Sequence, residues 1–98
     1  MLIRIVKLTL KEENISSFEA LFEETKEVIR NFEGCLFLEL YQDKDYPNIF
    51  FTYSKWEADM YLQAYRQSDF FKSVWSRTKV LFQEKAKAWS VTQKASLA

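Results

Sequence analysis

Residues 14–42 read NISSFEALFEETKEVIRNFEGCLFLELYQ, and the hydrophobic period changes within this stretch from helical to extended. The first half carries an apolar stripe with steps of three and four residues, which predicts an amphipathic helix. The stripe consists of Ile15, Phe18, Leu21, Phe22, Thr25, Val28, Ile29 and Phe32. Asn14 stands where an N-cap is expected, and Gly34 where a left-handed C-terminal cap is expected. Residues 35–42 then alternate as a strand does, with leucines on one face.

Two further strands flank this unit. Residues 2–10 alternate with apolar side chains on both faces, which indicates that both sides of this strand are covered. Residues 49–56 predict a third strand. The turn-forming cluster DKDYPN at residues 43–48 joins it to the strand at residues 35–42, so these two strands are expected to form a hairpin.

Helical periodicity returns after the third strand and breaks near Gln67. Ser68 is a second N-cap candidate, and the amphipathic pattern of residues 70–82 predicts a helix after it. Residues 85–92 alternate again and supply the last strand. Residues 94–98 are expected to be a frayed tail.

The resulting order, β-α-β-β-α-β, is that of the ferredoxin-like α+β fold, an antiparallel four-stranded sheet with both helices on one face. A single domain of residues 1–93 accommodates all of these elements. The helices leave one face of the sheet uncovered. This face carries Ile3, Ile5, Phe37 and Tyr41, or the side chains that alternate with them. An apolar face of that size predicts a partner, and a symmetric homodimer, sheet against sheet, is the simplest one.

The charges of the 98-residue chain balance, with 14 Lys and Arg against 14 Asp and Glu. This balance speaks against nucleic acid and against an anionic membrane surface, since both require clustered positive charge. The start of the chain has no apolar run long enough for a signal peptide or a membrane span, so a soluble cytoplasmic protein is expected. Nine Phe, five Tyr and three Trp suit a flat apolar ligand or a large subunit interface.

Three absences narrow the chemistry. The chain has no histidine, which excludes His-activated nucleophiles and the common His-ligated metal and haem sites. Cys35 is the only cysteine, so neither an internal disulfide nor a cysteine-based metal site is expected. The only glycine is Gly34, which excludes a glycine-rich phosphate loop.

Three phrases of the sequence carry a family resemblance: NFEGC at residues 31–35, YSKWE at residues 53–57 and YRQSDFFK at residues 65–72. In this order and spacing the chain resembles the antibiotic biosynthesis monooxygenase (ABM) domain family, the dimeric α+β barrels, over residues 2–92. The resemblance implies a small cavity between helices and sheet in each subunit. It also implies oxidation of a quinol or another electron-rich aromatic by O2, with no metal or flavin as cofactor.

Related members of the family degrade haem, and the signature of that branch can be compared residue by residue. The resemblance places Val6 at the position of the branch's asparagine, Tyr65 at that of its tryptophan and Trp75 at that of its histidine. All three residues differ, and no histidine is present to ligate iron. Haem degradation is therefore not expected.

The resemblance also implies which residues line the cavity and contact the substrate: Val6, Trp56, Tyr65, Phe71 and Trp75. Several relatives carry a histidine near Gln67 as a proton acceptor, and the chain lacks it. A base must then be Tyr65, a carboxylate such as Glu39, or water held by Arg4 or Gln67. A tyrosine with the ordinary pKa of ~10 needs a cation beside it to act near neutrality. Arg66 is adjacent to Tyr65 in sequence, but neighbouring residues of a helix do not face each other. Arg4 is the better candidate if its strand face points at the helices, so Tyr65 and Arg4 are the catalytic candidates.

A second interpretation is a non-catalytic dimeric binding or scaffold domain of the same fold. In that case Trp75, Tyr65 and the phenylalanines would plug the cavity. The cavity volume separates the two interpretations, because an opening below about 300 Å³ leaves no room for a bicyclic quinol.

Overall fold

The structure, a computed structural model, describes residues 1–98 and contains four strands and three α-helices. In chain order these are β1 (Leu2–Leu10), α1 (Ile15–Arg30), β2 (Cys35–Gln42), β3 (Ile49–Trp56), α2 (Asp59–Arg66), α3 (Asp69–Lys79) and β4 (Phe82–Thr92). A single 3₁₀ turn, η1 (Glu12–Asn14), precedes α1. All strand pairs are antiparallel, and the strand order is β2-β3-β1-β4. This order confirms the ferredoxin-like α+β fold.

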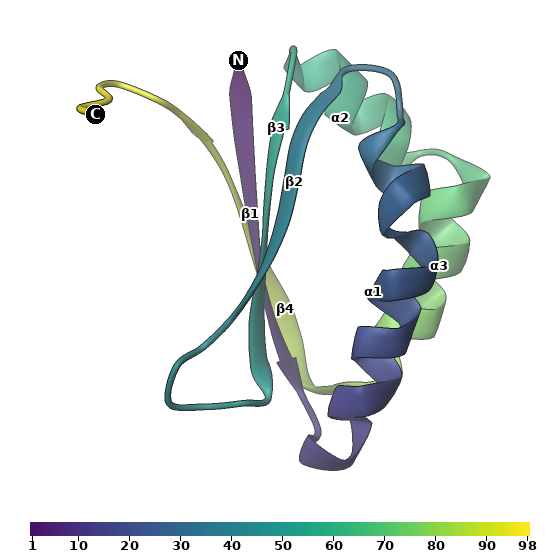
Figure 1. Cartoon of the computed structure of the whole chain (residues 1–98). Coiled ribbons are helices and arrows are strands. Elements are labelled where there is room, and N and C mark those ends of the chain that lie inside the picture. Colours follow the sequence, from purple (N-terminus) through teal and green to yellow (C-terminus); the bar gives the residue numbers. More distant parts are fainter.

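The helices cover one face of the sheet, with α1 and α3 running side by side along it (Figure 1). Two buried clusters hold the layers together. One joins Leu8, Leu10, Phe18 and Phe50, where β1 and β3 meet α1. The other joins Cys35, Trp56, Leu62 and Tyr65, where β2 and β3 meet α2. Burial of these apolar side chains is the main favourable contribution to folding, at roughly 1.5–3 kcal/mol for a fully buried one.

The structure settles which face of each strand the helices cover. Arg4, Val6 and Leu8 of β1 face the helices, because they line the same cavity as residues of α1, α2 and α3. Ile3 and Ile5, which alternate with them, therefore lie on the uncovered face. Tyr53 lies beside Ile5 on this face, and its ring is 6.0 Å from that of Phe37 and 6.4 Å from that of Tyr41.

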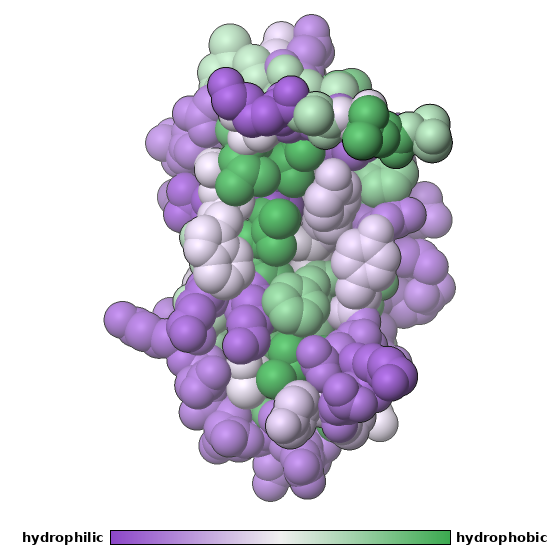
Figure 2. Space-filling view, turned by 90° about the vertical axis from the view of Figure 1, so that its left-hand side faces the viewer, coloured by the Kyte–Doolittle hydropathy of each residue, from purple (hydrophilic) through white to green (hydrophobic).

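This uncovered face is apolar along its centre. Figure 2, which views the sheet from the side opposite the helices, shows a hydrophobic band flanked by pale aromatic residues and hydrophilic margins. Several large side chains remain accessible here, with Tyr41 48%, Trp89 45% and Val91 39% exposed. The sequence left open which face of the sheet is uncovered. The uncovered face is the one that carries Ile3, Ile5, Phe37 and Tyr41.

Two details at the ends of the helices differ from expectation. Asn14 forms no side-chain cap on α1, and its Nδ2 instead donates to the Leu81 carbonyl at 3.3 Å. The second long helix ends at Lys79 rather than at Phe82. Phe82 pairs with Leu10 of β1, and the Lys11 amide donates to the Leu81 carbonyl at 3.0 Å. Pairing with β1 satisfies the backbone there, so the helix ends three residues earlier and β4 begins at Phe82.

Gly34 has a positive φ of +83°, as expected, but it does not cap the helix. The helix α1 ends at Arg30, Asn31 is its C-cap, and Gly34 lies in the turn that leads into β2. A Cβ atom at Gly34 would lie 2.2 Å from Cγ of Tyr61. Both the dihedral angle and the close approach of Tyr61 therefore require glycine. The predicted cap of α3 is confirmed, because the Ser68 hydroxyl accepts from the Phe71 amide at 3.1 Å.

Candidate functional site

A cavity of about 400 Å³ lies between the sheet and the helices. Fifteen of its 21 lining residues are hydrophobic, so its interior favours an apolar ligand. The volume exceeds the threshold of about 300 Å³ below which a bicyclic quinol would not fit. The two catalytic candidates and all the predicted substrate-contacting residues line this one cavity: Arg4, Val6, Trp56, Tyr65, Phe71 and Trp75.

Four of these residues form a continuous row of rings along one wall. Trp56 stacks on Tyr65 with 5.3 Å between ring centroids, and Tyr65 meets the edge of Phe71 at 5.0 Å. Phe71 stacks on Trp75 at 5.9 Å and an angle of 8° between planes. The row crosses from β3 over α2 to α3, so three separate elements of the chain supply one aromatic surface. Trp75 is part of this wall and does not fill the cavity.

Tyr65 is 8% exposed, and burial raises the pKa of its phenol far above the usual value. The nearby Cys35 contributes to the shift in the same direction, and no cation opposes it. The hydroxyl is therefore protonated at neutral pH, which makes it a hydrogen-bond donor and not a base. Its neighbour Trp56 is fixed by a hydrogen bond from Nε1 to the Ser54 hydroxyl at 3.0 Å.

Arg4 brings a positive charge to one end of the cavity. Its Nη1 donates to the Ser90 hydroxyl at 2.9 Å, and the side chain is half-buried. Burial lowers the pKa of the Arg4 guanidinium, Arg66 lowers it further, and Asp59 opposes the shift. Neither Arg4 nor Arg66 forms an ion pair within the chain, because the two ion pairs present join Lys26 to Glu23 and Arg77 to Glu24.

Arg66 was not among the sequence-selected residues, although it also lines the cavity. It stands in the last turn of α2, where its Nη1 donates to Oε1 of Gln63 at 3.3 Å. The sequence argument set Arg66 aside because neighbouring residues of a helix do not face each other, and this argument does not exclude that both residues border one cavity. Only the placement of α2 over the sheet brings Arg66 to the side of Arg4.

Two of the alternative proton acceptors lie elsewhere. Glu39 is on the uncovered face of the sheet, opposite Tyr53 in the strand register, and its carboxylate accepts a hydrogen bond from Tyr41. Gln67 is exposed at the C-cap of α2 and does not line the cavity. Neither residue therefore lies at the cavity. Glu39 lies on the face of β2 that the helices do not cover, and Gln67 lies at the exposed end of α2.

Two threonines of the helical stripes also line the cavity. The Thr25 hydroxyl donates to the Leu21 carbonyl at 2.8 Å, and the Thr78 hydroxyl donates to the Val74 carbonyl at 2.7 Å. Because these hydroxyls bond to their own helices, the threonines add little polarity to the cavity. Their positions in the apolar stripes were the sequence signal for this location.

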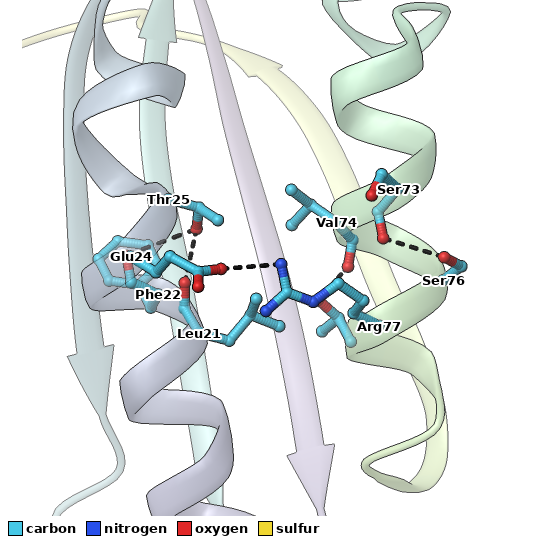
Figure 3. A network of polar contacts seen from close by, with 9 residues as sticks. Leu21, Phe22, Glu24, Thr25, Ser73, Val74, Ser76 and Arg77 are labelled. Atoms are coloured by element: carbon cyan, nitrogen blue, oxygen red, sulfur yellow. Dashed lines mark hydrogen bonds and ion pairs between the residues drawn. The ribbon is translucent and has the colours of Figure 1, made fainter.

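One ion pair bridges α1 and α3 next to this part of the cavity. Arg77 Nη1 lies 2.8 Å from Oε2 of Glu24, and both side chains are more than half exposed. Figure 3 shows the pair between the helices, with Leu21, Thr25 and Val74 close by. An exposed pair of this kind contributes little to stability, about 0.2–1 kcal/mol.

The Cys35 thiol is buried, and burial raises its pKa. Its Sγ lies 3.8 Å from the Phe37 carbonyl, consistent with a packed structural thiol. No group of three or more His, Cys, Asp or Glu side chains is arranged to hold a metal ion. No helix is both long and apolar enough to cross a membrane.

The domain is a two-layer α+β protein with an aromatic-walled cavity between its sheet and its helices. Comparison with known proteins identifies its family. The family model described as antibiotic biosynthesis monooxygenase matches residues 1–75. The chain belongs to the antibiotic biosynthesis monooxygenase family, as its three sequence phrases indicated. No curated protein matches the sequence.

Solved structures share the whole fold. A conserved protein from Methanosarcina mazei Go1 is 24% identical with a TM-score of 0.89, over 96% of this chain and 94% of that chain. A structure described as an antibiotic biosynthesis monooxygenase is 20% identical with a TM-score of 0.90, over 97% and 100% of the two chains. A protein from Pseudomonas aeruginosa is 21% identical with a TM-score of 0.83, over 96% and 94%. These likenesses establish the fold.

Proposed function

We propose that this protein is a cofactor-independent monooxygenase that oxidises a quinol or another electron-rich aromatic with O2 inside the cavity. The observation that carries the proposal is the aromatic wall of Trp56, Tyr65, Phe71 and Trp75 around a space of about 400 Å³. Offset and edge-on ring contacts with such a wall would orient a flat substrate. Membership of the monooxygenase family supports the same reaction class.

The chemistry follows from the substrate as much as from the protein. A deprotonated phenol transfers one electron to O2, and the resulting radical pair combines to a peroxide that loses water. One oxygen atom enters the product and the other leaves as water, and all four electrons come from the substrate. The cavity contributes by holding the reactants together and by excluding bulk water from the radical pair.

The charged and polar side chains of the cavity supply the remaining functions. The positive charges of Arg4 and Arg66 favour the phenolate over the phenol, so they lower the pKa of the bound substrate. The protonated Tyr65 hydroxyl can donate a hydrogen bond to the oxygen that becomes negatively charged. The proton itself passes to water at the polar end, since no carboxylate or imidazole lines the cavity.

The protein would act as a homodimer that joins two copies through the uncovered sheet face. Ile5 and Tyr53 lie at the centre of this face, and Trp89 and Val91 on β4 remain accessible at its side. An unpartnered apolar surface of this kind favours self-association. Sedimentation equilibrium tests this: Val91→Glu should weaken the dimer, whereas the matched change Val80→Glu, at the 69% exposed C-cap of α3, should not. Wild-type protein that sediments as a monomer at micromolar concentration would refute the dimer.

Oxygen uptake by metal-free protein tests the reaction. A panel of naphthoquinols and anthrones is measured against the autoxidation blank. We expect saturable uptake above the blank, with kcat lowered in Tyr65→Phe and in Arg4→Gln. Tyr46→Phe, in an exposed loop at 62% exposure, is the matched control and should behave as the wild type. Uptake equal to the blank with every panel member would contradict the proposal.

A second candidate is a non-catalytic small-molecule-binding domain of the same fold. One observation favours it: the tyrosine in the cavity is held in its protonated form, and no other side chain there can accept a proton. The open volume is compatible with both candidates but not with a plugged cavity. Saturable binding of a quinol without oxygen uptake would establish this second function.

A further inference from the structure

The charge distribution inside the cavity is unbalanced. Among its 21 lining residues Arg4 and Arg66 are charged, and no aspartate or glutamate accompanies them. Arg4 is half-buried and bonds only to the neutral Ser90 hydroxyl, and Arg66 bonds only to the neutral Gln63 amide. A half-buried cation such as Arg4, at the edge of a mostly apolar cavity and without an ion-pair partner, is costly unless an anion neutralises it, and the exposed Arg66 adds a second positive charge beside it.

The two arginines also define a polar end. Arg4 lies opposite Ser54 of β3 and Ser90 of β4 in the strand register. Two residues further along β1 the cavity is lined by Val6, and four residues further by Leu8 opposite Phe50. The lining therefore changes along the strand from cationic to mostly apolar and uncharged. A ligand that matches this gradient has an apolar body with a negative group at one end.

The net charge at the polar end of the cavity favours a monoanionic ligand over a dianionic one. Asp59, at the start of α2, is close enough to act on Arg4, although it forms no ion pair with it. Two arginines with one nearby carboxylate leave a net charge of about one positive unit. A monoanion matches this charge better than a phosphate dianion. Guanidinium groups bind planar carboxylates with two parallel hydrogen bonds, which an alcohol cannot accept in the same way.

We propose that the cavity binds an aromatic carboxylate, with the carboxylate between Arg4 and Arg66 and the rings against Val6, Leu8 and the aromatic wall. The inference rests on the proposed function for the cavity as the substrate site, and it adds the substrate class: an electron-rich aromatic acid. Arg66 becomes a specificity-determining residue for this substrate.

Binding of an unreactive ligand tests the inference separately from catalysis. 2-Naphthoate contains no oxidisable phenol, and its neutral isostere 2-naphthamide lacks the charge. Calorimetric titration of both into the wild-type protein, without O2, should show at least tenfold tighter binding of 2-naphthoate. 2-Naphthyl phosphate, which carries a dianionic group on the same ring system, should bind more weakly than 2-naphthoate. The affinity for 2-naphthoate should also fall as salt rises.

The arginine variants locate the effect. Arg66→Gln and Arg4→Gln should each weaken 2-naphthoate about tenfold, equivalent to ~1.4 kcal/mol, and leave 2-naphthamide unchanged. Arg77→Gln, an exposed arginine that does not line the cavity, is the matched control and should retain wild-type affinity. Because Arg66 is exposed, its variant is expected to fold even where Arg4→Gln is destabilised.

Two results would overturn the inference: equal affinity for 2-naphthoate and 2-naphthamide, or tight 2-naphthoate binding that neither Arg66→Gln nor Arg4→Gln weakens. Absence of 2-naphthoate binding would overturn it as well. Oxygen uptake with neutral naphthoquinols can persist in each of these cases. Conversely, selective 2-naphthoate binding together with blank-level oxygen uptake would support the inference and refute the monooxygenase proposal.

Discussion

The ring of Trp56, the last residue of β3, stacks on the ring of Tyr65 in α2, with 5.3 Å between centroids and 27° between planes. This contact ties the sheet to the helical layer at the polar end of the cavity. Trp56 is 1% exposed and its indole donates to Ser54, so it is a rigid platform. The position of the Tyr65 ring in the cavity wall depends on this platform.

The buried phenol predicts a loss of stability in alkali. In the unfolded chain Tyr65 titrates near pH ~10, whereas burial keeps it protonated in the folded chain to higher pH. Above this pH the folded state binds more protons than the unfolded state. The free energy of unfolding should therefore fall as pH rises, by roughly 1.4 kcal/mol per pH unit from this group. Cys35, whose pKa is also raised, contributes in the same direction.

Urea denaturation at pH 8, 10 and 11 measures this effect. Tyr65→Phe should show a shallower decline above pH 10 than the wild type, because it lacks the titrating group. Tyr46→Phe, which alters an exposed tyrosine, should keep the wild-type slope. Identical slopes for wild type and Tyr65→Phe would show that the phenol ionises as readily in the folded chain as in the unfolded one.

Gly34→Ala is expected to destabilise the fold by at least about 2 kcal/mol. A side chain at φ +83° is strained, and its Cβ would lie 2.2 Å from Cγ of Tyr61. Tyr61 is part of α2, so the substitution would also displace the helix that carries Tyr65 and Arg66. Chemical denaturation of Gly34→Ala against Glu33→Ala, an exposed neighbour, provides the comparison. Equal stabilities of the two variants would contradict the close packing of Gly34 on Tyr61.

Ser68→Ala should lower the free energy of unfolding by about 1 kcal/mol through the loss of the α3 cap. The hydroxyl accepts from the Phe71 amide and donates to the Tyr65 carbonyl at 2.6 Å, so it joins α2 to α3. Ser68→Asp, which retains an acceptor, should recover most of the loss. Ser73→Ala, in an exposed part of α3, is the matched control. If Ser68→Ala and Ser73→Ala have the same stability in thermal unfolding, the Ser68 hydroxyl does not stabilise α3 as a cap.

Trp75→Ala tests whether Trp75 lines the cavity and contacts a ligand or only fills space between the layers. Trp75 is only partly buried, between Phe71 and the ring of Phe82 at 5.6 Å. We expect a loss below the ~3–5 kcal/mol typical of fully buried tryptophans, together with a changed affinity for aromatic ligands. Urea denaturation and ligand titration measure both, and Trp89→Ala on the opposite face should leave the affinity unchanged. A loss within that range with unaltered affinity would mean that Trp75 only packs.

Most of the elements were predictable because they depend on neighbouring residues. The alternation of residues 2–10, 35–42 and 49–56 yields the strands β1, β2 and β3 with the same bounds. The end of α3 was not predictable in this way. Leu81 and Phe82 continue the helical spacing, but pairing of Phe82 with Leu10, a residue far away in sequence, draws them into the sheet.

The site was predictable in part. The family resemblance led to Val6, Trp56, Tyr65, Phe71 and Trp75, and the need for a cation beside Tyr65 led to Arg4. All six residues line the cavity. Glu39 was misplaced because β2 carries apolar residues on both faces, and local alternation does not say which face the helices cover. Arg66 was set aside because neighbouring residues of a helix do not face each other, yet both Tyr65 and Arg66 border the cavity once α2 lies over the sheet.

The order of elements, the ferredoxin-like topology and the family could all be read from the amino-acid sequence, because local periodicity and short phrases depend on residues close together in the chain. The open face of the sheet, the size of the cavity and the charges that line it became known only from the packing of the elements. These features arise from packing between β1, β3, α2 and α3, whose side chains meet only when the helices dock on the sheet. The placement of Arg4 and Arg66 on one cavity, and the anionic ligand that we propose from it, also depend on this packing.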